Sequence, residues 1–346
     1  MSYTITVLPS ERAFEQEQDE RILNAAIRQG VGLPYSCRDG TCGTCKCKKI
    51  SGTVVMGPHQ QKALSDEEEA AGYILTCCGT ATSDVVLESR QVTSEDAFPI
   101  QKMPARVAAL APLTHDVLHV RLQLPANTNL QYHPGQYVEI ILRDGARRDY
   151  SMATAPHMMR DGGVPMIDLH IRHTPGGKFT DHVFQAMKEK EILRLGGPYG
   201  SAYLREDSSA PIILLASGTG FAPIKTMIEH LHFTNSARDA VLYWGGRRPR
   251  DLYMEDWIHE HVAQMPNLRY VPVVSNALPE DNWTGRTGFV HLAVLEDHPD
   301  LSGYQVYACG TPAMVDAARD DFALAGLPDY EFYADPFTTE ADKAKP

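Results

Sequence analysis

Four cysteines have the spacing of iron–sulfur ligands. Cys37, Cys42 and Cys45 follow one another as Cys-x₄-Cys-x₂-Cys, and Cys77 lies further along the chain. This is the ligand pattern of plant-type [2Fe–2S] sites. The loop contains the small residues Ser36, Gly40, Thr41, Gly43 and Thr44, so the backbone can approach a cluster closely, and glycine among them permits the left-handed φ values of a tight loop. The sequence therefore predicts four metal ligands, namely Cys37, Cys42, Cys45 and Cys77.

A structural zinc site is the alternative use of these thiols. Cys42 and Cys45 form one Cys-x₂-Cys knuckle, but the second half would be the adjacent pair Cys77 and Cys78. Zinc sites are usually built from two knuckles whose cysteines are separated by other residues. An adjacent pair is poor geometry for one zinc ion, which favours the iron–sulfur interpretation.

A second group of motifs has residue types suited to a flavin. Arg148-Asp149-Tyr150-Ser151 offers a guanidinium that can clamp a pyrophosphate, a ring that can stack on an isoalloxazine, and a hydroxyl or amide for its N5. A strand ending at Arg172 then leads through Gly176-Gly177 into a helix, with Thr180 or Asp181 expected near its N-cap. Helix N-termini bind phosphate groups. FAD is therefore expected, with FMN as the competing flavin.

A glycine-rich turn indicates a nicotinamide dinucleotide. The segment 217–223 follows an apolar strand and precedes a helix, which is the context in which such a turn cradles a pyrophosphate. Proline replaces the third glycine of Gly-x-Gly-x-x-Gly, and proline is tolerated in a first helical turn. Two more strands end in glycine-containing segments, where an open sheet binds its ligands. The predicted contacts are Gly218, Thr219, Gly220, Pro223, Gly245, Arg247, Cys309, Gly310 and Pro312.

Three patterns of secondary structure position these motifs. Up to residue 90, strand alternation at 3–8, helical spacing from 22 and a Ser65–Glu68 capping box follow the order of a ferredoxin β-grasp. Short strands between turn residues then predict an antiparallel barrel, with a Gly-Pro-x-Gly turn at 197–200 closing it. From 212 onward, apolar strands alternate with helices, which predicts a parallel Rossmann-like sheet.

The sequence thus predicts an α+β multidomain protein. The expected parts are a [2Fe–2S] ferredoxin domain at 1–90, a linker at 91–103, an FAD-binding β-barrel at 104–206 and a Rossmann-like α/β NAD(P)-binding domain at 207–346.

With these motifs the chain resembles the three-domain ferredoxin-reductase-type oxygenase reductases, in particular the branch of CDP-6-deoxy-glucoseen and terephthalate dioxygenase reductases. The resemblance implies that Ser151 lies beside the flavin, Cys309 beside the nicotinamide ring, and the Asp335-Pro336-Phe337 ending beside both. Ser151, Cys309 and Phe337 are accordingly the expected catalytic residues. It also implies a set of flavin-binding residues: Arg148, Tyr150, Ser151, His170, Ile171, Arg172, Gly176, Gly177, Lys178 and Thr180.

The activity implied by the resemblance is electron transfer from NAD(P)H through FAD and the [2Fe–2S] cluster to a Rieske-type aromatic-ring oxygenase. A CDP-hexulose dehydrase system and a diiron monooxygenase are alternative acceptors. A different class is a zinc-knuckle binding module joined to a degenerate nucleotide-binding domain. For the coenzyme, Arg247 and Arg286 could receive the 2′-phosphate of NADPH. Asn276 stands where NADPH-selective relatives often carry arginine, which favours NADH.

Composition limits the partners and the compartment. The net charge of −12 argues against binding to nucleic acid or to an anionic membrane. Seven cysteines, four of them assigned to a cluster, fit a reducing compartment. Neither a signal-peptide pattern nor a long apolar run is present in the sequence. We expect a cytoplasmic monomer that meets its electron acceptor transiently.

Overall fold

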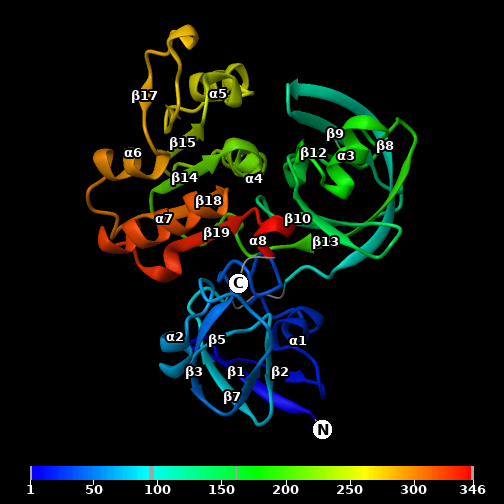
Figure 1. Ribbon diagram of the computed structural model, residues 1–346, viewed down its shortest axis with the longest axis vertical. Coiled ribbons are helices and arrows are strands. Elements are labelled where there is room, and N and C mark those ends of the chain that lie inside the picture. The colour runs from blue at the N-terminus through cyan, green and yellow to red at the C-terminus, as the bar shows by residue number, and fades with distance from the viewer. Residues whose placement is uncertain (1, 93–96, 161, 344–346) are drawn as a thin grey trace. The chain divides into compact units, whose positions relative to one another are not determined.

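The computed structural model describes residues 2–92, 97–160 and 162–343 (Figure 1). The chain divides into two compact units. The first unit comprises Met1–Pro99, Gly200–Ala202 and Tyr333–Pro346, and the second comprises Ile100–Tyr199 and Tyr203–Phe332. Part of the expected linker, residues 93–96, lies outside the described residues.

A mixed five-stranded sheet forms the centre of the first unit, in the order β2-β1-β7-β3-β5. The alternation expected at 3–8 is confirmed, because Ile5 and Val7 are buried in β1, which pairs in parallel with β7. Helix α1 packs against β2 and β6. The ferredoxin β-grasp is thereby confirmed. Its elements are β1 (Tyr3–Leu8), β2 (Arg12–Gln16), α1 (Ile22–Arg28), β3 (Lys46–Ser51), β4 (Val54–Met56), α2 (Asp66–Ala70), β5 (Tyr73–Leu75), β6 (Gly79–Ala81) and β7 (Val85–Glu88).

Local signals set the ends of the two ferredoxin helices as expected. Ser65 and Glu68 form the predicted capping box at the start of α2. Gly30 and Gly72 follow the C-caps of α1 and α2 with φ values of 73° and 90°. Glycine adopts this left-handed conformation without the strain that a Cβ would cause.

The barrel of the second unit is a six-stranded antiparallel sheet in the order β11-β10-β13-β8-β9-β12. An isolated bridge between Met152 and Leu169 joins its two ends. Inward-facing apolar residues such as Val107, Val120 and Ile171 fill its core. The elements are β8 (Gln101–Thr114), β9 (Val117–Gln123), β10 (Tyr137–Ile141), β11 (Arg147–Ser151), β12 (Met166–Arg172), α3 (Lys178–Gln185), β13 (Ile192–Tyr199) and a 3₁₀ turn at Pro156–Met158.

Three local predictions in this region differ from the structure. Helix α3 has Gly177 as its N-cap, three residues before the expected Thr180, because the Thr180 hydroxyl bonds back to Thr174 instead of capping the helix. The expected turn at 197–200 lies largely within β13, which pairs with β8 as far as Gly197. Residues 101–103, expected in the linker, are the first residues of β8.

The Rossmann-like part of the second unit is confirmed as a parallel sheet in the order β17-β16-β15-β14-β18. Its central strand β14 is buried over Ile212–Ala216, as a strand covered on both faces must be. Helices α6 and α7 pack together on one face, and α4 and α5 lie on the other (Figure 1).

The elements of this sheet and of the C-terminal segment are β14 (Ile212–Ser217), α4 (Phe221–Phe233), β15 (Ala240–Gly246), α5 (Glu255–Gln264), β16 (Leu268–Val274), β17 (Arg286–Thr287), α6 (Val290–Asp297), β18 (Gln305–Gly310), α7 (Pro312–Leu324), β19 (Phe332–Pro336) and α8 (Glu340–Lys343). Short 3₁₀ turns are formed at Gly218–Gly220, Pro249–Asp251, Pro279–Asp281 and Asp329–Glu331. Within the described part of the chain, no helix combines the length and apolar character of a membrane span.

Candidate cluster and cofactor sites

The loop that carries three of the predicted ligands depends on two glycines. Gly40 and Gly43 have φ values of 80° and 74°. A Cβ at Gly40 would lie 2.7 Å from the Cys78 sulfur, and one at Gly43 would lie 3.2 Å from the Ala63 carbonyl oxygen. A larger residue at either position would therefore be strained in its backbone and crowded by its neighbours.

The predicted ligands form two thiol pairs. A hydrogen bond with Cys42 is the main cause that raises the pKa of Cys37, and the same bond lowers the pKa of Cys42 to about 6. A hydrogen bond with Cys45 is likewise the main cause that raises the pKa of Cys77. In a [2Fe–2S] centre each iron binds two protein ligands, so the pairs Cys37–Cys42 and Cys45–Cys77 fit one such centre. Among the described residues, no three His, Cys, Asp or Glu side chains could together hold a single metal ion.

Two cysteines lie next to these pairs. The Cys78 sulfur is 3.6 Å from that of Cys77, and this neighbour is the first cause that raises its pKa. Cys47 is buried, and burial raises the pKa of its thiol to about 12. The choice of Cys77 over Cys78 as the fourth ligand remains a prediction from the spacing.

The structure brings the two predicted flavin motifs together in the barrel. Arg148 and Tyr150 lie on one face of β11, since side chains alternate along a strand, and Ser151 lies on the other face. The Tyr150 ring is 5.4 Å from the ring of Phe179, which belongs to the first turn of α3. Lys178, the first residue of α3, forms an ion pair of 2.9 Å with Asp144 in the turn between β10 and β11.

The N-terminus of α3 has amides that could bind an anion. No side chain caps this helix in the described structure, so its first amides keep their hydrogen-bonding capacity. The Thr180 hydroxyl instead donates to the Thr174 carbonyl oxygen at 2.8 Å and closes the preceding turn. Gly177 is required there, because a Cβ would lie 2.6 Å from the Thr180 Oγ1. Uncapped amides at a helix that contacts the Tyr150 ring fit the pyrophosphate of FAD.

Arg172 supplies further unused donors. It ends β12, and its Nη1 would lie 2.6 Å from a Cβ at Gly218, so the guanidinium rests against the glycine-rich turn. Its Nε is 3.2 Å from the Asp116 carboxylate, yet Nε and Nη2 are both buried without a hydrogen bond to any described residue. Buried donors are almost always satisfied, so two unmatched ones indicate room for a ligand oxygen, as a phosphate would provide.

The other two predicted residues of β12 use their side chains inside the protein. The Nδ1 of His170 lies 3.1 Å from the Tyr253 hydroxyl, and burial, followed by the charge of Lys225, lowers the pKa of His170 to about 3. The Ile171 side chain is fully buried in the barrel core. These two side chains have partners inside the protein, whereas Arg172 keeps buried donors without a hydrogen bond to a described residue. The role of all three residues in flavin binding stays a prediction.

The glycine-rich turn packs backbone against backbone with the end of β18. A Cβ at Gly220 would lie 2.0 Å from the Cys309 carbonyl oxygen, and one at Gly310 would lie 2.3 Å from the Ser217 Oγ. The Ser217 hydroxyl also accepts a hydrogen bond from the Thr311 amide at 2.9 Å. The predicted contacts Gly218, Thr219, Gly220, Cys309 and Gly310 thus come together at the carboxyl edge of the sheet, where dinucleotides bind.

Proline opens both helices that start at this edge. Pro223 is buried in the first turn of α4, and Pro312 is the first residue of α7. Neither position needs an intrahelical amide bond, so proline is compatible with both. Gly245 lies at the end of the neighbouring strand β15, where a Cβ would be 2.9 Å from Val290 of α6. Its small size serves the packing of that helix.

The two arginines that could receive a 2′-phosphate differ in what their side chains already bind. Arg247 is exposed, and its backbone amide is held by the Asp251 carboxylate at 2.9 Å. Arg286 is already committed, with hydrogen bonds of 2.6 and 2.8 Å to Asp297 and an ion pair to Glu296. Arg247 is therefore the better of the two candidates for a 2′-phosphate, and the preference for NADH remains a prediction.

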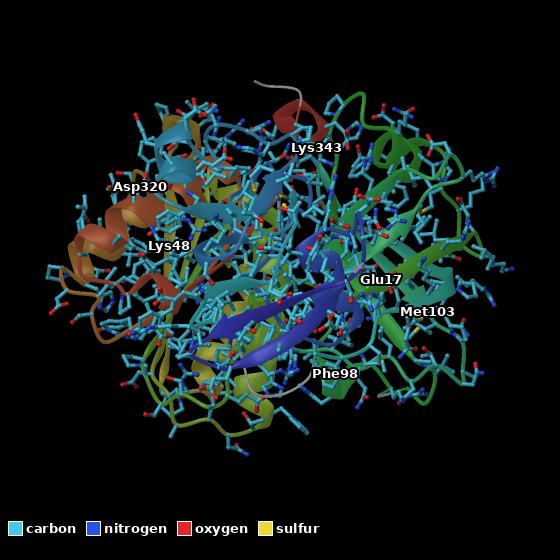
Figure 2. All side chains as sticks on the ribbon, turned by 90° about the horizontal axis from the view of Figure 1, so that it is seen from below. Glu17, Lys48, Phe98, Met103, Asp320 and Lys343 are labelled. Atoms are coloured by element: carbon cyan, nitrogen blue, oxygen red, sulfur yellow. The ribbon has the colours of Figure 1, made fainter. Side chains whose placement is uncertain are left out.

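The expected catalytic residues are divided between the units. Ser151 and Cys309 are buried in the second unit. Phe337 belongs to the first unit, together with Asp335, whose carboxylate accepts a 2.7 Å hydrogen bond from the Ser36 hydroxyl in the cluster loop. Lys343, at the end of α8 (Figure 2), forms a 2.9 Å ion pair with Asp39 of the same loop.

Sequence reasoning missed a buried charged pair on α4, Lys225 and Glu229. Their spacing of four residues on an otherwise apolar helix was the available signal.

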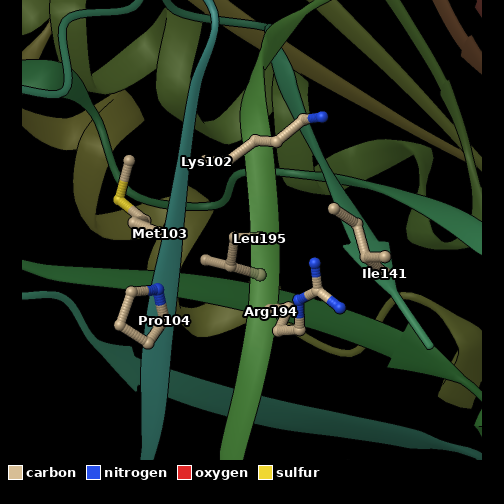
Figure 3. A pocket seen from close by; sticks show the side chains of 6 residues that line it. All are labelled: Lys102, Met103, Pro104, Ile141, Arg194 and Leu195. Carbon is tan, nitrogen blue, oxygen red and sulfur yellow. The ribbon is translucent and has the colours of Figure 1, made fainter. Parts of the chain in front are cut away.

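A hollow of about 350 Å³ lies on the barrel, and none of the predicted site residues lines it. It is lined by Lys102, Met103, Pro104, Ile141, Arg194 and Leu195 (Figure 3).

Three family models match successive parts of the chain. They describe a 2Fe-2S iron-sulfur cluster binding domain (residues 5–82), an oxidoreductase FAD-binding domain (104–203) and an oxidoreductase NAD-binding domain (214–320). The cofactors of the chain are thus a [2Fe–2S] cluster, FAD and a nicotinamide dinucleotide, in agreement with the thiol pairs, the N-terminus of α3 and the glycine-rich turn.

Relatives extend over nearly the whole chain. CDP-6-deoxy-L-threo-D-glycero-4-hexulose-3-dehydrase reductase of Yersinia pestis is 41% identical, covering 97% of this chain and 99% of its own. Terephthalate 1,2-dioxygenase reductase component 2 of Comamonas sp. is 34% identical, with 98% of both chains covered. The crystal structure of Amycolatopsis cytochrome P450 reductase GcoB matches with a TM-score of 0.78 and 31% identity, covering 97% of this chain and 99% of that one. The chain therefore belongs to the family of three-domain reductases that combine a plant-type ferredoxin, an FAD-binding barrel and an NAD-binding domain.

Proposed function

We propose that this protein is the reductase component of a Rieske-type aromatic-ring oxygenase, which takes electrons from NADH in pairs and delivers them singly to the oxygenase. The observation that carries the proposal is that one chain combines a 2Fe-2S domain, an FAD-binding domain and an NAD-binding domain, and that Arg172 of the barrel lies against Gly218 of the glycine-rich turn. A bound flavin supplies the chemistry that divides a hydride's two electrons into single ones.

The side chains have separate tasks in this scheme. Arg148, Arg172 and the first amides of α3 hold the FAD pyrophosphate, and Tyr150 lies on the same face of β11 as Arg148. Residues 218–220 and 309–311 form the floor on which the dinucleotide lies. Ser151 and Cys309 flank the reacting rings, and the thiols of the two pairs hold the irons.

A second candidate acceptor is a deoxysugar dehydrase. The identity to the Yersinia pestis dehydrase reductase is 41%, against 34% to the terephthalate dioxygenase reductase. Partner choice depends on surface residues, which overall identity samples poorly, so both acceptors enter the test. We further propose that the protein is a cytoplasmic monomer and that its contact with the acceptor is transient.

The test reconstitutes each electron chain from purified components. The full-length protein and NADH are combined without other reductases, first with the oxygenase component of terephthalate 1,2-dioxygenase and terephthalate, then with the dehydrase and its CDP-sugar. Product formed in the first reaction supports the oxygenase role, and product formed only in the second replaces it with the dehydrase role. NADH-driven reduction of cytochrome c establishes that the preparation is competent, and light scattering measures the mass in solution.

A further inference from the structure

A charged pair on α4 has so far been given no function of its own. Lys225 and Glu229 form an ion pair four residues apart, and their side chains are only 12% and 5% exposed. Burial raises the pKa of Glu229, and the charge of Lys225 opposes this rise. Removing two charges from water is costly unless further polar groups satisfy them. The pair is therefore expected to serve partners beyond itself.

Those partners are backbone groups of the segment that leaves the flavin strand. Lys225 Nζ donates to the Ala153 carbonyl oxygen at 3.0 Å. The Ala155 amide donates to Glu229 Oε2 at 3.2 Å. Ala153 and Ala155 follow Ser151 at the end of β11. The ion pair thus fastens the exit of the Arg148–Ser151 motif to α4.

The barrel holds the same segment from the other side. The Ala153 amide donates to the Asp168 carbonyl oxygen at 2.7 Å, and the Asp168 amide donates to the Thr154 Oγ1 at 2.8 Å. The Tyr132 hydroxyl donates to the Thr154 carbonyl oxygen at 2.8 Å. Residues 153–155 are therefore tied to β12 and to α4 at once.

Helix α4 begins directly after the glycine-rich turn at 218–220, so the pair lies on the element that also carries the dinucleotide floor. We propose that Lys225 and Glu229 are positioning residues for hydride transfer. By fastening residues 153–155 to α4, they set where a flavin held at β11 stands relative to a dinucleotide held at residues 218–220. This rests on the proposed placement of the two cofactors. Because a displacement of about 1 Å between reacting groups can cost about 10²-fold in rate, a fastening of this kind has a measurable effect.

The test compares variants of the full-length protein. Lys225→Met removes the donor to Ala153 and the cation that pairs with Glu229, whereas Lys225→Arg retains a cation that can donate to both groups. Glu229→Gln preserves shape but removes the charge, and Glu229→Asp, one methylene shorter, carries the same expectation. The matched control is Glu191→Gln, which removes the carboxylate from a partly exposed 2.7 Å pair with His182 of α3, away from α4.

Two measurements are made on each variant. Rapid mixing with NADH without oxygen gives the limiting rate of flavin bleaching and, separately, the NADH dissociation constant. Hydrogen–deuterium exchange of the peptide containing residues 152–156 reports the fastening without any turnover. We expect the limiting rate to fall about tenfold or more in Lys225→Met and Glu229→Gln, with NADH affinity unchanged and exchange faster. Lys225→Arg and Glu191→Gln should match the original protein.

Wild-type limiting rates in both variants would overturn the positioning role, whatever the exchange shows. A loss confined to NADH affinity would overturn it as well, because it would place the pair in dinucleotide binding. The original protein is the check on the function itself. If NADH does not bleach its flavin, the proposed function fails, whereas a working original protein with unaffected variants refutes only the role of the pair.

Discussion

Gly220→Ala is expected to disrupt the floor of the dinucleotide site. Gly220 has φ −56° and ψ −13°, an ordinary helical conformation that alanine also adopts. The obstacle is contact, since the new Cβ would lie 2.0 Å from the Cys309 carbonyl oxygen, 2.4 Å from its carbon and 2.8 Å from the Gly310 Cα. All three atoms belong to the backbone of β18, which hydrogen bonds to β14 along its length, so no side chain can turn aside.

The cost can be estimated from this geometry. Cβ atoms in proteins are essentially never closer than 3.0 Å to such neighbours, so the Cys309 carbonyl must retreat by about 1 Å. Overpacking of this kind lowers the free energy of unfolding by about 1–3 kcal/mol. Because residues 309–311 move with it, kcat/KM for NADH should fall by about 10²-fold.

Gly303→Ala is the matched control in the same sheet domain. A Cβ there meets nothing within 4 Å, and the residue has no left-handed φ. Its free energy of unfolding should change by no more than about 0.5 kcal/mol. Urea unfolding and steady-state ferricyanide reduction with NADH measure the two quantities. Equal stability and equal kcat/KM in the two variants would refute the reasoning from backbone contact.

Three further outcomes are expected. Cys77→Ser should lose visible cluster absorbance and NADH-driven cytochrome c reduction, while its ferricyanide reduction continues. Cys78→Ser should keep the absorbance and both activities. The reverse pattern would make Cys78 the ligand in place of Cys77. Arg148→Ala should weaken FAD binding by about 1.5–3 kcal/mol, the value of a charge-assisted hydrogen bond, so flavin would be lost on desalting with iron content unchanged. Unchanged flavin occupancy would contradict the assigned role. Burial holds the pKa of His170 at about 3 in the folded state, below its ordinary 6.5. Below pH 6.5 the unfolded chain takes up a proton at His170 that the folded chain does not, so the free energy of unfolding falls as the pH drops from 6.5 toward 3. Thermal melting of His170→Gln at pH 7 and 5 should therefore show a smaller drop than the original protein, and an identical drop would contradict this.

Features with a local cause were predictable from the sequence. The capping box of α2 needs only Ser65 and Glu68, which lie three residues apart. The four cluster ligands were assigned from their spacing alone and stay a prediction. The start of α3 was misplaced because Thr180 can either cap a helix or bond back into the preceding turn, and both uses involve neighbouring residues. The segment around Gly197 was misread because a Gly-Pro pair usually marks a turn, whereas here strand pairing with β8 extends to that residue.

Contacts between distant segments were not predictable in this way. The approach of Arg172 to Gly218 follows from how the barrel and the parallel sheet pack together, which no motif records. Lys225 and Ala153 are 72 residues apart, and their bond depends on a backbone carbonyl whose direction is set by the barrel. Sequence patterns indicate which residues suit a ligand, whereas hydrogen bonds between distant segments, such as that from Lys225 to Ala153, are seen only in the folded chain.

The first unit is made of segments that lie far apart in the sequence, and this has a consequence for biosynthesis. Ser36 and Asp39 of the cluster loop find their partners in Asp335 and Lys343, and Ser36 and Asp335 are 299 residues apart. A ribosome adds about 5–20 residues per second, so the loop emerges roughly 15–60 seconds before its partners. Through that interval the loop lacks its two bonds to the C-terminal segment. If iron and sulfide were inserted during translation, they would therefore bind to a loop that is not yet bonded to the C-terminal segment.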